Sequence, residues 1–173
     1  MARLFFALWP DQAARVALAA RAKELATRSG GRPVPEANLH LTLVFIGEVE
    51  PSGVRILQGV PEGLAADAFS VELDVIGGFR GARVAWAGSR RPPQAMLALQ
   101  AALEGKVREA GLQPDERPFA PHLTLARRVR DAVALQAMDS VSWRARSFAL
   151  VESGGNASAY RTVAEWMLRE GED

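Results

Sequence analysis

The chain has 173 residues, of which 49% are hydrophobic and 24% are charged, and its formal net charge at pH 7 is +1. This composition is typical of a folded domain and argues against a disordered chain. Cysteine is absent, which excludes disulfides and thiolate chemistry, and no run approaches the roughly 20 apolar residues of a membrane span. We therefore expect one domain over residues 1–173, cytoplasmic, monomeric and without a membrane partner.

The first part of the chain predicts a strand, a helix and a second strand, in that order. Residues 3–9 form a short apolar and aromatic run, which favours a strand. Pro10 and Asp11 favour a helix start, and apolar residues then recur at helical spacing until Gly30 ends the pattern. A loop with two prolines follows, and the next apolar run begins at His40.

The same order of elements occurs again in the second half of the chain. Residues 83–87 favour a strand, Pro92 and Pro93 favour a helix start, and Gly111 favours its end. After another loop with two prolines, an apolar run begins at His122. The chain therefore contains a weak internal repeat.

The remaining segments are predicted to be mostly β. Apolar and polar residues alternate over residues 69–76, as on a strand with one buried face. We also expect strands at 148–151 and 162–168, short helices at 51–59 and 131–138, and a turn or bulge at Gly77 and Gly78.

The repeat ends each time in the tetrapeptide His-Leu-Thr-Leu. The chain has two histidines and four threonines, and both histidines and two of the threonines lie in these tetrapeptides, at 40–43 and 122–125. Side chains on a strand alternate between faces, so His40 and Thr42 share a face, as do His122 and Thr124. If the halves pack with pseudo-twofold symmetry, the two pairs face each other across one cleft.

Two opposed imidazoles and two hydroxyls favour phosphodiester hydrolysis or transfer without a metal. Imidazole titrates near pH 6.5, so one ring can accept a proton while the other donates one. Buried structural histidines are the simplest alternative. A zinc site is less well supported, because catalytic zinc normally takes three protein ligands and the chain has no third histidine and no cysteine. A serine hydrolase would need a G-x-S-x-G elbow, which is absent.

The paired His-x-Thr motifs and the segments 3–7, 38–49, 83–88 and 117–127 together carry a family resemblance. They resemble the 2H phosphoesterase superfamily, and within it the RNA 2′,3′-cyclic phosphodiesterases, also called 2′-5′ RNA ligases. The resemblance runs from Arg3 to about Leu168. It implies an α+β fold with two pseudo-symmetric lobes of antiparallel sheet, helices outside, and a central groove lined by the motif strands.

The resemblance also implies a reaction and a partner. The expected reaction hydrolyses 2′,3′-cyclic phosphate ends of RNA to 2′-phosphates with no metal or other cofactor, and reversible ATP-independent 2′-5′ ligation accompanies it. The expected partners are cyclic-phosphate-ended RNAs, such as tRNA-like fragments, or cyclic nucleotides. Two other functions stay open: a phosphodiesterase of the same fold acting on small cyclic nucleotides or 2′-5′ oligonucleotides, and a module that binds RNA ends without turnover.

By the same resemblance His40 would protonate the leaving oxygen and His122 would be the general base, although the pseudo-symmetry leaves these two roles hard to separate. Thr42 and Thr124 would hold the phosphate. Arg127 matches an arginine that the family carries just after its second motif, and it would bind substrate. Regular alternation from His122 puts Arg127 on the opposite face, so it would have to swing in at the strand end.

Overall fold

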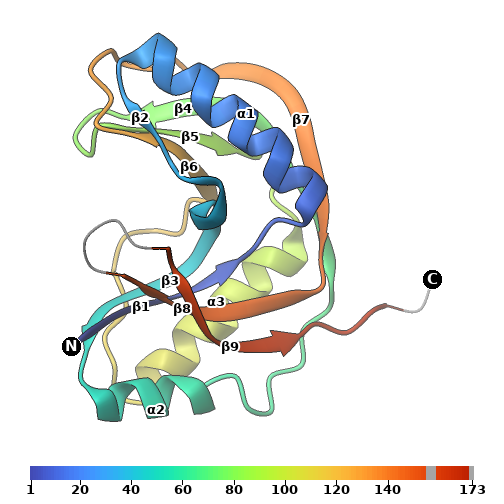
Figure 1. Ribbon diagram of the computed structural model, residues 1–173. Coiled ribbons are helices and arrows are strands. Elements are labelled where there is room, and N and C mark those ends of the chain that lie inside the picture. Colours follow the sequence, from blue (N-terminus) through green and yellow to red (C-terminus); the bar gives the residue numbers. More distant parts are fainter. Residues whose placement is uncertain (155–158, 172–173) are drawn as a thin grey trace.

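The structure, a computed structural model that describes residues 1–154 and 159–171, is a continuous sheet with helices packed against it (Figure 1). In the described residues the strands are β1 (Ala2–Leu8), β2 (Arg32–Pro33), β3 (Leu41–Val49), β4 (Phe69–Phe79), β5 (Val84–Gly88), β6 (His122–Arg127), β7 (Gln136–Ala145), β8 (Ser147–Ser153) and β9 (Arg161–Met167). The α-helices there are α1 (Gln12–Ser29), α2 (Pro51–Gly59) and α3 (Gln94–Glu109), and a 3₁₀ turn covers Glu36–Asn38.

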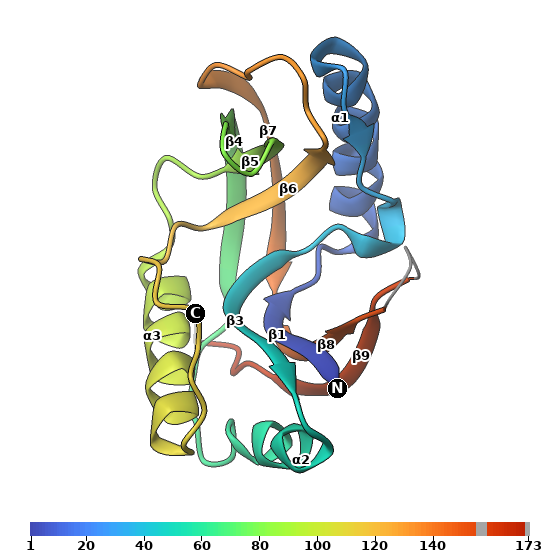
Figure 2. The same ribbon diagram turned by 90° about the vertical axis from the view of Figure 1, so that its left-hand side faces the viewer.

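The strand order is symmetric about the middle of the sheet. It reads β7-β4-β5-β6-β3-β1-β8-β9, with β2 beside β6. In the described chain β6 and β3 pair antiparallel at one position, Leu41 opposite Leu123. Figure 2 shows these two strands in the middle, with β4, β5 and β7 to one side and β1, β8 and β9 to the other. The α+β prediction is confirmed, the symmetric order favours the two-lobe interpretation, and the single-domain assignment stays a prediction.

Each of the two long helices packs on strands from the other half of the chain. Helix α1 begins where the Asp11 carboxylate accepts a hydrogen bond from the Ala14 amide at 2.9 Å, and it ends at Gly30, whose φ of 71° is in the left-handed region that favours glycine. It follows β1 but packs on β6, β2 and β7, whereas α3 follows β5 but packs on β3. Each helix therefore covers the motif strand that comes from the other half of the chain.

The leucines of the two motifs lie on the face that the helices cover. Leu41, Leu43, Leu123 and Leu125 are each at most 2% exposed and belong to the main hydrophobic core. Burying one such side chain contributes roughly 1.5–3 kcal/mol, so these four residues fix the orientation of both strands. The opposite face of β3 and β6 is left to the histidines and threonines.

Most predicted elements are present, but two predictions are wrong. The helix expected at 131–138 is absent, and β7 occupies the second part of this segment because Val141, Trp143 and Ala145 alternate with exposed residues and bury against β4. Gly77 and Gly78 form neither a turn nor a bulge but continue β4 opposite Trp86 and Ala85. A Cβ atom at Gly77 would lie 2.5 Å from the Trp86 ring, so glycine is needed for close packing there.

The helices of the described chain are also too short or too polar to cross a membrane.

Candidate active site

The two His-Leu-Thr-Leu motifs meet where β3 and β6 pair. Leu41 lies opposite Leu123 and both leucines point into the core, so the histidine and threonine that flank each leucine lie on the other face of the sheet. Opposed residues of an antiparallel pair share a face, so the flanking residues of both strands face the same side. We call these four side chains the His-Thr quartet. Each histidine thus has a threonine two residues further along its own strand on the same face.

Both imidazoles are held by the same local contact. Nδ1 of His40 lies 2.7 Å from the carbonyl oxygen of Asn38, and Nδ1 of His122 lies 2.7 Å from that of Ala120. A carbonyl oxygen can only accept, so Nδ1 carries the proton and donates it in both rings. In a neutral ring Nε2 then has a free lone pair, and at His40 it lies 3.0 Å from the Thr42 hydroxyl, which donates to it.

Three aromatic rings enclose His40. Its ring stacks on Phe5 with the centroids 4.8 Å apart, and Tyr160 and Trp9 approach edge-on with centroids at 5.4 and 5.9 Å. This burial lowers the pKa of His40 to about 4, against the raising effect of the hydrogen bond to Asn38. The positive charge of Arg127 lowers this pKa further, as does His122 when it is protonated.

His122, the other imidazole of the quartet, is less enclosed than His40. Phe79 approaches its ring edge-on with centroids 5.1 Å apart, and the Trp86 centroid lies 6.4 Å away. Burial lowers the pKa of His122, the hydrogen bond to Ala120 opposes this, and the charges of Arg117 and Arg127 add to the lowering. Because both pKa values lie below 6.5, both imidazoles are neutral at pH 7 in the free protein.

A β-bulge turns Arg127 toward the His-Thr quartet. Trp86 pairs with Thr124 but Ala85 pairs with Ala126, so β6 carries one extra residue between these two pairs. Leu125 and Ala126 are consequently both buried in the core, and alternation resumes with exposed Arg127 on the face of His122. The alternation argument that placed Arg127 on the opposite face is therefore wrong. The effect of its charge on both histidines agrees with this position.

Strand β3 has the matching bulge. Ala7 pairs with Thr42 while Phe6 pairs with Val44, so β3 also has an extra residue directly after its motif threonine. Phe45 then turns away from the main core and packs with Phe5 in a second apolar cluster beside His40. The fifth residue after each histidine is thus directed to the same face, as phenylalanine in one half and arginine in the other.

Sequence reasoning missed Arg32, which lies directly opposite Arg127 in the β2–β6 pair. Like charges directly opposed in a sheet are destabilising, and within the described residues neither side chain forms a salt bridge. Two guanidinium groups opposed in this way, one of them near both histidines, can bind phosphate oxygens. No sequence signal marked this strand, because β2 is two residues long and contains a proline.

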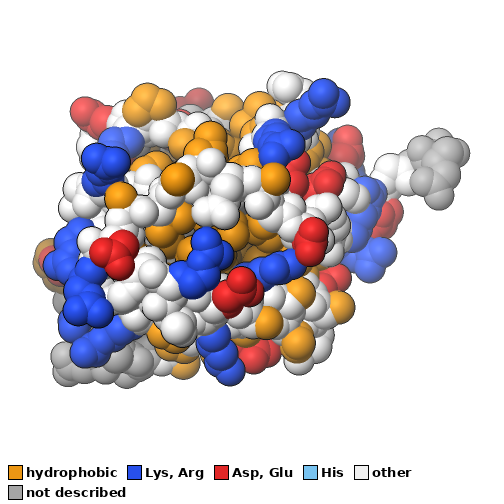
Figure 3. Space-filling model, turned by 90° about the horizontal axis from the view of Figure 1, so that it is seen from above, with side chains coloured by type: hydrophobic (Ala, Val, Ile, Leu, Met, Phe, Trp, Pro, Cys, Tyr) orange, Lys and Arg blue, Asp and Glu red, His pale blue; other side chains and the backbone are white. Residues whose placement is uncertain are grey.

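Seen from above (Figure 3), the surface of the molecule is mixed in charge rather than uniformly basic. Figure 3 shows Lys and Arg side chains interspersed with Asp and Glu around a hollow with a hydrophobic floor. In residues 1–154 and 159–171 no three His, Asp or Glu side chains cluster as metal ligands would. The positive charge near the histidines comes from individual arginines, Arg127 for His40 and Arg117 followed by Arg127 for His122.

Comparison with known proteins gives consistent matches over most of the chain. A family model described as the 2′-5′ RNA ligase superfamily matches residues 10–157. The RNA 2′,3′-cyclic phosphodiesterase of Escherichia coli is 35% identical over 134 residues, 77% of this chain and 76% of that protein. That of Thermus thermophilus is 30% identical over 168 residues, 87% and 81% of the two chains. The crystal structure of E. coli LigT complexed with 3′-AMP superposes with a TM-score of 0.87 at 30% identity, covering 96% and 98% of the two chains.

Proposed function

Because the chain belongs to the 2′-5′ RNA ligase superfamily, we propose that it is an RNA 2′,3′-cyclic phosphodiesterase, which opens the cyclic phosphate at an RNA end. The observation that carries this proposal is the His-Thr quartet, set on one face by the pairing of Leu41 with Leu123. A single phosphorus atom between the two imidazoles would have a proton acceptor on one side and a proton donor on the other.

In the proposed reaction a water molecule attacks phosphorus in line with the ribose 3′-oxygen. Nε2 of His122 accepts the proton of the water as the new P–O bond forms. On the opposite side the bond from phosphorus to the 3′-oxygen breaks, and His40 supplies the proton that this oxygen needs. The product carries a 2′-phosphate.

The threonines and Arg127 act on the phosphate oxygens that do not leave. The hydroxyls of Thr42 and Thr124 donate hydrogen bonds to them, and the guanidinium of Arg127 compensates their charge as it grows in the transition state. These groups suffice for proton transfer and charge stabilisation, so we propose a metal-independent mechanism.

The low pKa of His40 couples its proton to substrate binding. At neutral pH the free imidazole is neutral and cannot act as an acid, because its pKa is about 4. A cyclic phosphate carries one negative charge, and a negative charge close to an imidazole raises its pKa. His40 therefore takes up its proton as the substrate binds.

The same geometry supports ligation and several substrates. A 5′-hydroxyl in place of the water would give a 2′-5′ linkage without ATP, and the reaction would be reversible. Aromatic side chains near His40, among them Phe45 and Tyr160, suit the nucleoside of either an RNA end or a small cyclic nucleotide. Monomeric state and cytoplasmic location are further parts of the proposal.

The test is turnover of 2′,3′-cyclic AMP in excess EDTA. We expect the wild type to be active and to release 2′-AMP, and His40→Ala and His122→Ala each to lose at least about 100-fold in kcat, the contribution of one acid-base group. Thr124→Val should also lose activity, whereas Thr27→Val, on the exposed side of α1, should keep it. Loss of activity in EDTA would refute metal independence, and 3′-AMP as product would reverse the leaving-group assignment.

A further inference from the structure

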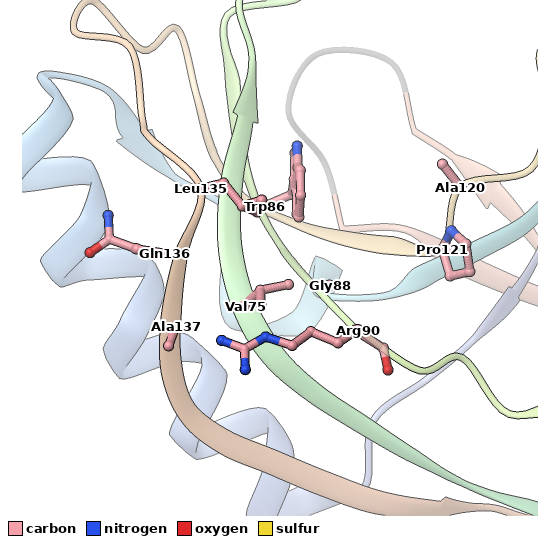
Figure 4. A pocket seen from close by; sticks show the side chains of 10 residues that line it. Val75, Trp86, Gly88, Arg90, Ala120, Pro121, Leu135, Gln136 and Ala137 are labelled. Carbon is pink, nitrogen blue, oxygen red and sulfur yellow. The ribbon is translucent and has the colours of Figure 1, made fainter.

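A cavity of about 650 Å³ lies next to His122, and the mechanism above makes no use of it. Pro121 and Ala120, the two residues before His122, form one of its walls (Figure 4). Its lining also includes Val75, Trp86, Gly88, Arg90, Leu135 and Ala137. They come from β4, β5, β7 and the segments beside β5, β6 and β7.

The cavity continues the face that carries His122. His122 pairs with Gly88, Gly88 with Val75, and Val75 with Ala137, so these residues form one row across β6, β5, β4 and β7. Paired residues share a face, and each step between strands is about 4.8 Å. The row is therefore about 14 Å long, which is enough for one nucleotide beyond a phosphorus atom held by the quartet.

The lining has the chemistry of a nucleotide site. The Trp86 indole lies against Gly77 and Gly88, where a Cβ atom would be 2.5 and 2.9 Å from its ring. Leu135 is 72% exposed, so its apolar side chain is available to a base. Apolar and aromatic surfaces of this kind hold nucleobases.

Arg90 adds a charge suited to a phosphate. Its backbone amide donates to the Asp74 carboxylate at 3.0 Å, but within the described residues its guanidinium forms no salt bridge. Figure 4 shows this side chain extending toward Val75 and Ala137. A guanidinium of this kind binds phosphate oxygens through paired hydrogen bonds.

We propose that this cavity binds the nucleotide that carries the attacking 5′-hydroxyl in 2′-5′ ligation, with Arg90 on its 3′-phosphate. The inference rests on the proposed function, in which the nucleophile enters on the side of His122. In this step the bond from the 5′-oxygen to phosphorus forms and the bond from phosphorus to the 3′-oxygen breaks. His122 accepts the proton of the 5′-hydroxyl, and His40 donates one to the 3′-oxygen.

The reverse reaction provides the test, because it can be followed beside hydrolysis. The probe is 2′-5′-linked ApA with a 3′-phosphate, which should yield 2′,3′-cyclic AMP and 3′-AMP, and the reference substrate is 2′,3′-cyclic AMP alone. We expect Arg90→Gln to lower kcat/KM for the probe about tenfold, the effect of one lost hydrogen bond to a charged group, and to leave cyclic AMP hydrolysis within about twofold. Ala137→Trp, at an exposed position inside the cavity, should likewise lower kcat/KM for the probe and spare cyclic AMP hydrolysis. Arg91→Gln is the matched control and should leave both reactions unchanged.

Three results would overturn the inference. The first is unchanged probe cleavage in both cavity variants. The second is an equal loss of kcat/KM on both substrates, which would show that the cavity binds the nucleoside of the cyclic end instead. The third is a wild type that opens cyclic AMP but does not cleave the probe. A wild type inactive on both substrates would refute the proposed function together with the inference.

Discussion

The burial of His40 should make the protein less stable in mild acid, by an amount that one substitution isolates. Above pH 6.5 the imidazole is neutral in both the folded and the unfolded chain. As the pH falls, the unfolded chain binds a proton near pH 6.5, whereas the folded chain does so only near its pKa of about 4. Protonation therefore favours the unfolded chain, and the free energy of unfolding decreases between these two values.

The size of the effect follows from the two pKa values. With a His40 pKa of 6.5 in the unfolded chain and about 4 in the folded one, the free energy of unfolding at pH 5 is about 2 kcal/mol lower than at pH 7.5. This value is an upper estimate, because His40 keeps some contact with solvent. At pH 5 most carboxylates are still ionised, so their contribution to the change is small.

Urea unfolding at pH 7.5 and pH 5 measures this loss. His40→Asn removes the titration while its side-chain amide can still donate to the carbonyl oxygen of Asn38, as Nδ1 does now. The wild type should lose about 2 kcal/mol more than this variant, which is a midpoint difference of about 1 M urea for an m value near 2 kcal/mol/M. His122→Asn is the matched control, and its free energy of unfolding should still decrease between pH 7.5 and pH 5 because His40 is present. Equal pH dependence in the wild type and His40→Asn would refute the burial argument.

Two further predictions concern the reaction itself. The pH optimum of kcat should lie above that of kcat/KM. The value of kcat/KM reports the low pKa values of the histidines in the free protein, whereas kcat reports the complex, in which bound phosphate has raised the pKa of His40. Coincident optima would contradict the coupling of His40 protonation to substrate binding. Arg32→Gln and Arg127→Gln should each weaken binding of a cyclic-ended oligoribonucleotide and reduce the slope of log K against log salt by about 0.7, the value for one phosphate contact on a single strand. Arg144→Gln, whose side chain pairs with Glu170, should leave the slope unchanged.

The sequence predicted the motif strands well because their signal is local. Period-two alternation needs only neighbouring residues, and it correctly assigned Leu41 and Leu123 to the core. The bulges after Thr42 and Thr124 depend on how each strand pairs with its neighbour, which no local pattern records. For that reason the alternation rule failed for Arg127, five residues after His122.

Other errors also arose from contacts that are distant in sequence. The alternation of Val141, Trp143 and Ala145 was present in the sequence, but the segment before them was interpreted as a helix and β7 was not predicted. The pair Gly77 and Gly78 predicts a turn or bulge because paired glycines usually interrupt strands. The actual role of Gly77 is to make room for Trp86, which the sequence could not place beside it.

The symmetric scaffold places both histidines alike, so any difference between their roles must come from what surrounds them. The charges that oppose a proton on His122 include two guanidinium groups, those of Arg117 and Arg127, whereas His40 senses that of Arg127 and is otherwise enclosed by aromatic rings. Burial lowers the pKa of His40 in the free protein, and the same low dielectric strengthens its attraction to a bound phosphate. We therefore expect a bound phosphate to raise the pKa of His40 more than that of His122. We infer that the buried ring becomes the acid and the more open ring, beside the cavity, stays the base.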